Sequence, residues 1–277
     1  MKVICMALLA ILCAALPGLA TDMEITPFRT VNQRPLAQIF GLPSESSSAV
    51  APAGRFRLRL GMDVASEYTT SSTQNEQLTL DGETYRWALA AHYGIGERFE
   101  VGIEIPYVLH GGGFLDGFIT DWHSAFGLPQ GGRDSAVKDR LLYSYRKNGV
   151  QKLKLSNSGS GIGDVSLSGG MKLYDALGDS SHDSLALRAA LKLPSGDSGA
   201  LRGSGSVDFS LSLCGSMNSF TEWGSLGLYG SLGGMAMTNG KVLADQQNNV
   251  AGFGMVGLGW GPAEWVRLVQ IWKIFER

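Results

Sequence analysis

The chain has 277 residues, of which 44% are hydrophobic and 17% are charged, and its formal net charge at pH 7 is −2. This slight acidity argues against a nucleic-acid partner, because phosphate backbones attract surfaces rich in Lys and Arg. Glycine accounts for 38 residues, about twice the usual share of roughly 7%, as is common in tight turns, barrel interiors and low-complexity loops.

The first twenty residues have the pattern of a secretory signal peptide. Lys2 precedes an apolar run over residues 3–16, and the small residues Gly18 and Ala20 suit cleavage just after Ala20. We therefore expect export, with Cys214 as the single cysteine of the mature chain and no internal disulfide. No later stretch has about eighteen consecutive apolar residues, so a helical membrane anchor is not expected.

Residues 21–54 form a separate N-terminal segment in which prolines recur and apolar residues do not alternate. Two interpretations stay open. In the first, the segment packs against a barrel, either as a plug in its lumen or at its periplasmic mouth. In the second, the segment is a loose tether. The plug interpretation rests on apolar side chains that would not all be left in water. These side chains are Phe28, Leu36, Ile39, Phe40 and Leu42.

Three segments between residues 55 and 109 alternate apolar and polar residues with the period of a β-strand. Each has about ten residues or more, which exceeds the usual strand of a globular sheet and suits a tilted crossing of a bilayer. Tyr85 and Tyr93 lie near the two ends of one apolar face, about 20 Å apart along a membrane normal, which is close to the spacing of two interfacial aromatic girdles. The apolar faces consist of Phe56, Leu58, Leu60, Met62 and Val64; Tyr85, Trp87, Leu89, Ala91 and Tyr93; and Phe99, Val101, Ile103, Ile105, Tyr107 and Leu109.

The alternation recurs more weakly later in the chain, and short connections alternate with long ones, as in the turns and outer loops of transmembrane barrels. Within the longest connection, Asn148 and Gly149 favour a type I′ turn and predict a hairpin over residues 141–155. The six further strands are expected at 165–173, 185–193, 207–217, 225–236, 250–260 and 265–271; the long connections are expected at 69–83, 110–161, 194–206 and 238–249.

These patterns predict an all-β fold, an antiparallel up-and-down transmembrane β-barrel over residues 55–277, in the outer membrane of a Gram-negative bacterium. The competing fold is a soluble, secreted β-sandwich, whose apolar faces would meet in a dry core. Nine spanning strands make an odd number, whereas single-chain bacterial barrels have an even one. We therefore expect the barrel to be incomplete at its C-terminal end, unless one strand is missed or spurious.

Several stretches resemble an uncharacterised proteobacterial family, domain of unknown function 3187. They are residues 26–30 (Thr-Pro-Phe-Arg-Thr), 32–36 (Asn-Gln-Arg-Pro-Leu), 39–43 (Ile-Phe-Gly-Leu-Pro), 122–133 (beginning Trp-His-Ser-Ala-Phe-Gly-Leu-Pro) and 161–164 (Gly-Ile-Gly-Asp). The likeness extends over nearly the whole mature chain, although the chain ends earlier than family members do. The resemblance implies an outer-membrane barrel of unknown role and supplies no chemistry.

Charged residues gather on the polar faces of the first three predicted strands. In a barrel they would line the lumen, where a basic wall facing an acidic wall would set a field across a pore constriction. Alternatively, the charges pair and brace the wall, because small barrels are filled by their own side chains. The lumen-lining candidates are Arg57, Arg59, Arg86, Glu100 and Glu104.

An enzymatic site would need a constellation of catalytic residues. His110, Asp121 and His123 fall in the expected outer loop and could bind a metal or act as a base with its orienting group. No spacing fixes such a group, so we expect no enzyme, metal or cofactor.

The expected function is a channel or porin-like protein for small polar solutes. The alternatives are a structural or adhesion barrel that acts through its outer loops, and an outer-membrane lipid hydrolase. The expected partners are outer-membrane lipids, the barrel-assembly machinery and a small polar solute.

Overall fold

The computed structural model describes residues 25, 27, 32–43, 47–263 and 266–276. The predicted signal peptide over residues 1–20 and its cleavage site lie outside the described residues.

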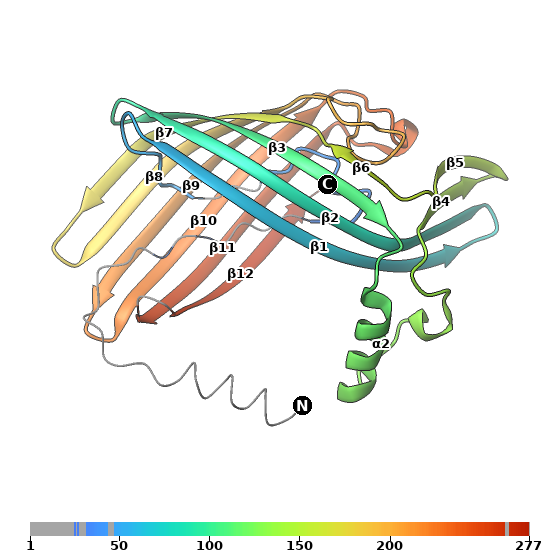
Figure 1. Cartoon of the computed structure of the whole chain (residues 1–277). Coiled ribbons are helices and arrows are strands. Elements are labelled where there is room, and N and C mark those ends of the chain that lie inside the picture. The colour runs from blue at the N-terminus through green and yellow to red at the C-terminus, as the bar shows by residue number, and fades with distance from the viewer. Residues whose placement is uncertain (1–24, 26, 28–31, 44–46, 264–265, 277) are drawn as a thin grey trace.

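One antiparallel sheet contains all twelve strands of the described residues (Figure 1). The nine long strands pair in the order β1-β2-β3-β7-β8-β9-β10-β11-β12, each beside its neighbour in the chain apart from the step from β3 to β7. The strands are β1 (Phe56–Ser72), β2 (Glu76–Ile95), β3 (Phe99–Gly111), β4 (Leu142–Lys147), β5 (Val150–Leu155), β6 (Gly159–Ile162), β7 (Ser166–Leu177), β8 (Ser181–Lys192), β9 (Asp208–Thr221), β10 (Gly224–Met237), β11 (Val250–Ala263) and β12 (Val266–Glu276). Among the described residues, the helical elements are α2 (Leu115–Phe126) and two single turns, η1 (Arg133–Ser135) and η2 (Ala244–Gln246).

The predicted antiparallel, up-and-down, all-β fold is confirmed, and each of the nine predicted segments coincides with a long strand. The predicted loop over residues 69–83 is wrong, because β1 continues to Ser72 and β2 already begins at Glu76. This part of β2 is held by the small hairpin β4–β5, with Leu80 opposite Tyr143 in the β2–β4 ladder. Its residues are mostly polar, so period-two alternation gave no signal there.

The sheet is strongly curled and open along one seam (Figure 1). Among the described residues, β1 is paired with β2 and β12 with β11, and the two outer strands share no ladder with each other. The helices add little to this architecture. Within the described part of the chain, no helix combines the length and hydrophobicity that crossing a bilayer requires.

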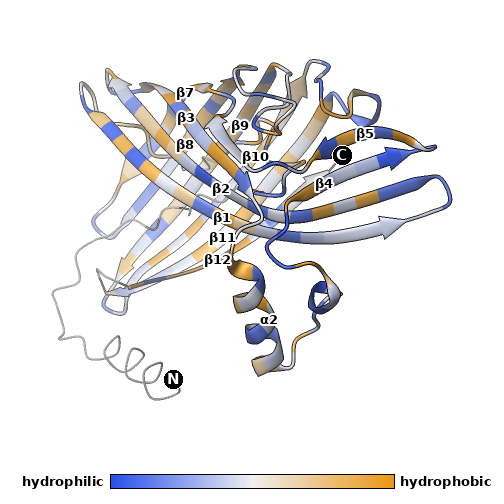
Figure 2. Ribbon diagram, turned by 45° about the vertical axis from the view of Figure 1, so that its right-hand side comes forward, coloured by the Kyte–Doolittle hydropathy of each residue, from blue (hydrophilic) through white to orange (hydrophobic). Residues whose placement is uncertain are grey.

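The two faces of the sheet have opposite polarity, and the apolar face is the exposed one. The ladders align Leu60 with Leu89 and Leu89 with Ile105, and these side chains are 73%, 51% and 39% exposed. Figure 2 shows the alternation along the strands. A β-sandwich would cover such a face with a second sheet, but the described strands all belong to one sheet.

A hydrophobic cluster fills the end of the sheet where the long connections lie. Its centre is Tyr143 of the β4–β5 hairpin, which packs with Ile39 of the N-terminal segment and Leu201 of the β8–β9 connection. Burial raises the pKa of Tyr143 to about 12, so its hydroxyl stays protonated. The predicted hairpin is confirmed, with positive φ at Asn148 (50°) and Gly149 (77°) as a type I′ turn requires.

Gly94 is a point of close approach between the N-terminal segment and the sheet. Its backbone forms a parallel bridge with Ala53, and a Cβ at this position would lie 2.1 Å from the carbonyl oxygen of Pro52. We predict that Gly94→Val displaces residues 51–54 and destabilises the fold by about 1–3 kcal/mol, the usual cost of overpacking. Circular dichroism in detergent, followed against temperature, measures this as a lower unfolding midpoint. In the matched control Gly252→Val, no atom lies within 4 Å of the added Cβ; equal midpoints for the two variants would contradict the prediction.

Candidate functional site

The polar face of the sheet is covered by the chain's own N-terminal segment, of which the structure describes residues 25, 27, 32–43 and 47–54. Its backbone amides donate hydrogen bonds to side chains of distant strands. Ile25 N lies 2.9 Å from Asn218 Oδ1 on β9, and Gly41 N and Ala51 N make the contacts described below. The segment therefore crosses the sheet from β9 to β3.

Sheet side chains also meet the carbonyl and hydroxyl groups of this segment. The guanidinium of Arg188 on β8 donates to the carbonyl oxygens of Ser47 and Ala49. Ser48 Oγ lies 2.7 Å from Ser184 Oγ on β8 and 2.9 Å from Ser216 Oγ on β9. Because buried backbone groups need partners, these contacts fix residues 47–51 in place although their sequence has no strand periodicity.

Glu100 on β3 is the centre of the first group of charges. Its carboxylate lies 2.6 Å from Arg188 Nη1 and 3.2 Å from Arg57 Nη2, and it accepts a hydrogen bond from Ala51 N at 2.6 Å. Glu100 is 2% exposed. Three parts of the chain, namely β1, β8 and the N-terminal segment, therefore meet at one buried carboxylate.

Glu104 on the same strand is the centre of the second group. Arg86 Nη2 of β2 lies 2.6 Å from Glu104 Oε1, Arg59 Nη2 of β1 lies 4.0 Å from Glu104 Oε2, and Arg86 also contacts Asp63 at 3.8 Å. The structure thus places all five predicted lumen-lining residues on the polar face and in ion pairs. Sequence reasoning missed Arg188 as a partner of Glu100, although its position on the polar face of the predicted strand 185–193 is visible in the alternation.

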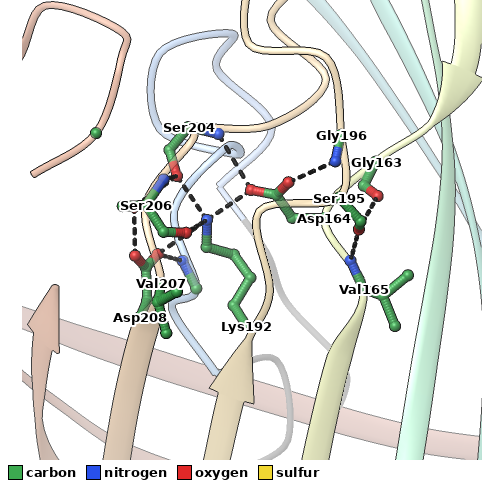
Figure 3. A network of polar contacts seen from close by, with 12 residues as sticks. Gly163, Asp164, Val165, Lys192, Ser195, Gly196, Ser204, Ser206, Val207 and Asp208 are labelled. Atoms are coloured by element: carbon green, nitrogen blue, oxygen red, sulfur yellow. Dashed lines mark hydrogen bonds and ion pairs between the residues drawn. The ribbon is translucent and has the colours of Figure 1, made fainter. Parts of the chain in front are cut away.

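A third group surrounds Lys192 at the end of β8 (Figure 3). Its ammonium lies 2.6 Å from Asp164 Oδ2 and 3.3 Å from Asp208 Oδ2, and it donates to Ser204 Oγ at 2.5 Å. Gly41 N donates to Asp208 Oδ2 at 2.7 Å. Lys192 is 4% exposed and Asp208 1%. This group joins β8, β9, the residues before β7 and the N-terminal segment.

A cavity of about 100 Å³ remains between the N-terminal segment and the sheet. Charges of both signs line it, from Arg59, Arg86, Glu104 and Lys192, together with the apolar ring of Phe40. The volume is sufficient for several water molecules. The cavity can therefore hold water or a small polar molecule between fixed charges.

The structure does not bring the three outer-loop candidates together. The prediction that His110 lies in the loop is wrong, because β3 extends to Gly111 and buries the ring. His110 Nε2 donates to Leu201 O at 3.0 Å, so Nδ1 accepts the hydrogen bond from Thr84 Oγ1 at 2.9 Å. Asp121 and His123 instead lie on α2, where His123 Nδ1 contacts Pro129 O at 2.8 Å. Among the described residues, no three His, Cys, Asp or Glu side chains gather in a way that could hold a metal ion.

These features define an all-β protein whose single curled sheet buries an ion-paired polar face and exposes an apolar one. The chain matches the family described as "Protein of unknown function (DUF3187)" over residues 3–274, and it belongs to that family. The family membership expected from the sequence motifs is thereby confirmed. A comparison with curated proteins finds no match.

Removal of the Glu100 carboxylate should strongly destabilise the fold. Glu100→Ala leaves Arg188 buried without its partner and deprives Ala51 N of its acceptor, and the loss of one member of a buried ion pair typically costs about 3–5 kcal/mol. Denaturant titration in detergent measures this as a lower unfolding midpoint. Glu97→Ala removes the same side chain from an exposed turn and serves as the control; a loss no larger than that of the control would refute the role of Glu100.

Proposed function

We propose that this chain forms the wall of a β-barrel in the outer membrane of a Gram-negative bacterium, after export and cleavage near Ala20. The observation that carries the proposal is the reversed polarity of the sheet. Leu60 is 73% exposed whereas Glu100 is 2% exposed. In water this arrangement would forgo about 25 cal/mol for each Å² of apolar surface left exposed. In a bilayer, lipid tails cover the apolar face and the polar face lines the interior.

Aromatic clusters at both ends of the apolar face support this placement. Near the short turns, Phe56 and Tyr93 pack with ring centroids 4.8 Å apart. Near the long connections, Trp87 lies 6.4 Å from Tyr85 and 6.2 Å from Tyr107. Aromatic side chains favour the two interfaces of a membrane, so the clusters mark the two borders of the proposed spanning region.

A sheet in lipid needs partners for the backbone groups of its edges, because each unsatisfied group costs several kcal/mol where water is absent. We therefore propose that the edges of β1 and β12 are joined in the membrane, either directly or through additional strands. The polar hollow then becomes an enclosed lumen.

For the role of this lumen, we propose a channel for small polar solutes in which the N-terminal segment acts as a plug. The side chains of Arg57 and Arg59 are 37% and 36% exposed, whereas Glu100 and Lys192 are almost fully covered. The accessible charges are thus mainly positive, while the buried ones hold the plug. The proposal assigns no catalytic step to any residue.

The membrane placement predicts how the protein fractionates. We expect it to stay in the membrane pellet after osmotic shock and to be released only by detergent, because its apolar face needs an amphiphile. Immunoblotting of the fractions checks this. Release into the osmotic-shock fluid without detergent would contradict the barrel and favour a soluble fold.

The channel proposal predicts altered ion selectivity when the accessible arginines are neutralised. Arg57→Gln combined with Arg59→Gln should shift the reversal potential in a salt gradient toward cation selectivity, because two positive charges leave the lumen. Single-channel recording in planar bilayers measures the shift. Arg55→Gln, at an exposed residue just before β1, is the control. An unchanged reversal potential would remove the constriction role of Arg57 and Arg59.

The plug predicts a closed or poorly conducting resting state. Deletion of residues 32–50 keeps the Ala53–Gly94 bridge and should raise the single-channel conductance several-fold, because the segment no longer covers the polar face. The same bilayer recordings test this. If neither the full chain nor the deletion variant conducts, the channel role fails, although the membrane placement would stand.

A further inference from the structure

Helix α2 carries an aromatic face that no other described residue covers. Phe118, Trp122 and Phe126 are 62%, 50% and 63% exposed, and Phe114, just before the helix, is 72% exposed. These residues are spaced by four, which places them along one side of a helix. Consecutive rings of the last three lie 6.0 and 4.5 Å apart. The result is a continuous aromatic stripe.

The helix begins on the apolar side of the sheet, next to the aromatic cluster near the long connections. Glu83 is two residues before Tyr85 on β2 and therefore shares its face. One oxygen of Glu83 accepts a hydrogen bond from Leu115 N at 2.6 Å, and the other accepts the hydroxyl of Tyr85. Glu83 is fully buried. A single carboxylate thus connects the first residue of α2 to the proposed membrane border.

A second contact fixes the helix from the same side. Asp116 is buried and forms an ion pair with Arg133. Arg133 donates to Ser66 Oγ at 3.0 Å, and its guanidinium lies over the Tyr68 ring at 5.6 Å. Ser66 is opposite Glu83 in the β1–β2 ladder, so both anchors lie at one level of the sheet. Figure 1 shows α2 projecting from the end of β3, away from the hollow of the sheet.

We infer that α2 lies in the interfacial layer of the outer leaflet, with its aromatic stripe toward the lipid acyl chains. This inference rests on the proposed membrane placement and extends it to a helix outside the sheet. One observation and one general rule favour lipid as the occupant of the stripe. Glu83 links the start of the helix to Tyr85 of the aromatic cluster at the proposed membrane border. Aromatic side chains on one face of a helix are typical of interfacial helices. Thr120 and Ser124 lie on the opposite side of the helix, where Gln130 Nε2 donates to Thr120 O at 3.0 Å and to Ser124 Oγ at 2.9 Å.

Spin labelling tests the inference with one nitroxide at a time. The background variant is Cys214→Ser, which removes the buried thiol of the mature chain. Cysteines are then placed at Phe118, at Ser124 as the control on the opposite side of the same helix, and at Leu60 as the reference for the apolar face of the sheet. The full chain is reconstituted into vesicles of phosphatidylethanolamine and phosphatidylglycerol. Power saturation compares each label's accessibility to oxygen, which concentrates in lipid, with its accessibility to a water-soluble nickel chelate.

The expected result is a ratio of oxygen to nickel accessibility several-fold higher at Phe118 than at Ser124, with Leu60 also in the lipid range. A water-like ratio at Phe118 beside a lipid-like ratio at Leu60 would overturn the inference and leave the proposed function intact. A label at Phe118 that is shielded from both reagents would also overturn it, because protein would then cover the stripe. A water-like ratio at Leu60 would refute the proposed function, and the inference with it.

Discussion

The burial of charges on the hollow side of the sheet is the constraint on which the rest of this structure depends. Glu100 and Lys192 are almost completely removed from water. In such a buried position, a charge without a partner costs several kcal/mol. Their partners come from β1, β8, β9 and the residues before β7. The strands must therefore keep one register, since a slip by one residue would turn these charges onto the apolar face.

The same constraint explains the course of the N-terminal segment. The ladders pair the backbone groups between neighbouring strands, and carboxylates such as Glu100 and Asp208 have additional acceptor capacity. The amides of Ala51 and Gly41 use it, while Arg188 donates in the reverse direction to carbonyl groups of the segment. Backbone groups thus bind the segment to the polar face, so its binding does not depend on a regular pattern of side chains.

Long strands were predictable because the signal for a strand is local. Leu60 and Ile103 belong to runs whose period of two is visible within ten residues. The signal failed at residues 69–83, where mostly polar strand ends are held by the distant hairpin β4–β5. It also failed for α2, whose Gly117 and β-branched Ile119 and Thr120 weaken helix propensity; contacts of Glu83 and Arg133 hold that helix.

The sequence by itself determined where the long strands lie, which of their faces is apolar and which is polar, and that the five charged residues of the first three strands share the polar face. The reason is that neighbouring side chains on a strand point to opposite faces whatever their surroundings. Only the tertiary structure decided which charges pair. Glu100 meets Arg188 across 88 positions of the chain, and His110 is buried on β3 whereas His123 lies on α2. Such contacts depend on strand neighbours and on the path of the N-terminal segment, which no local pattern of residues encodes.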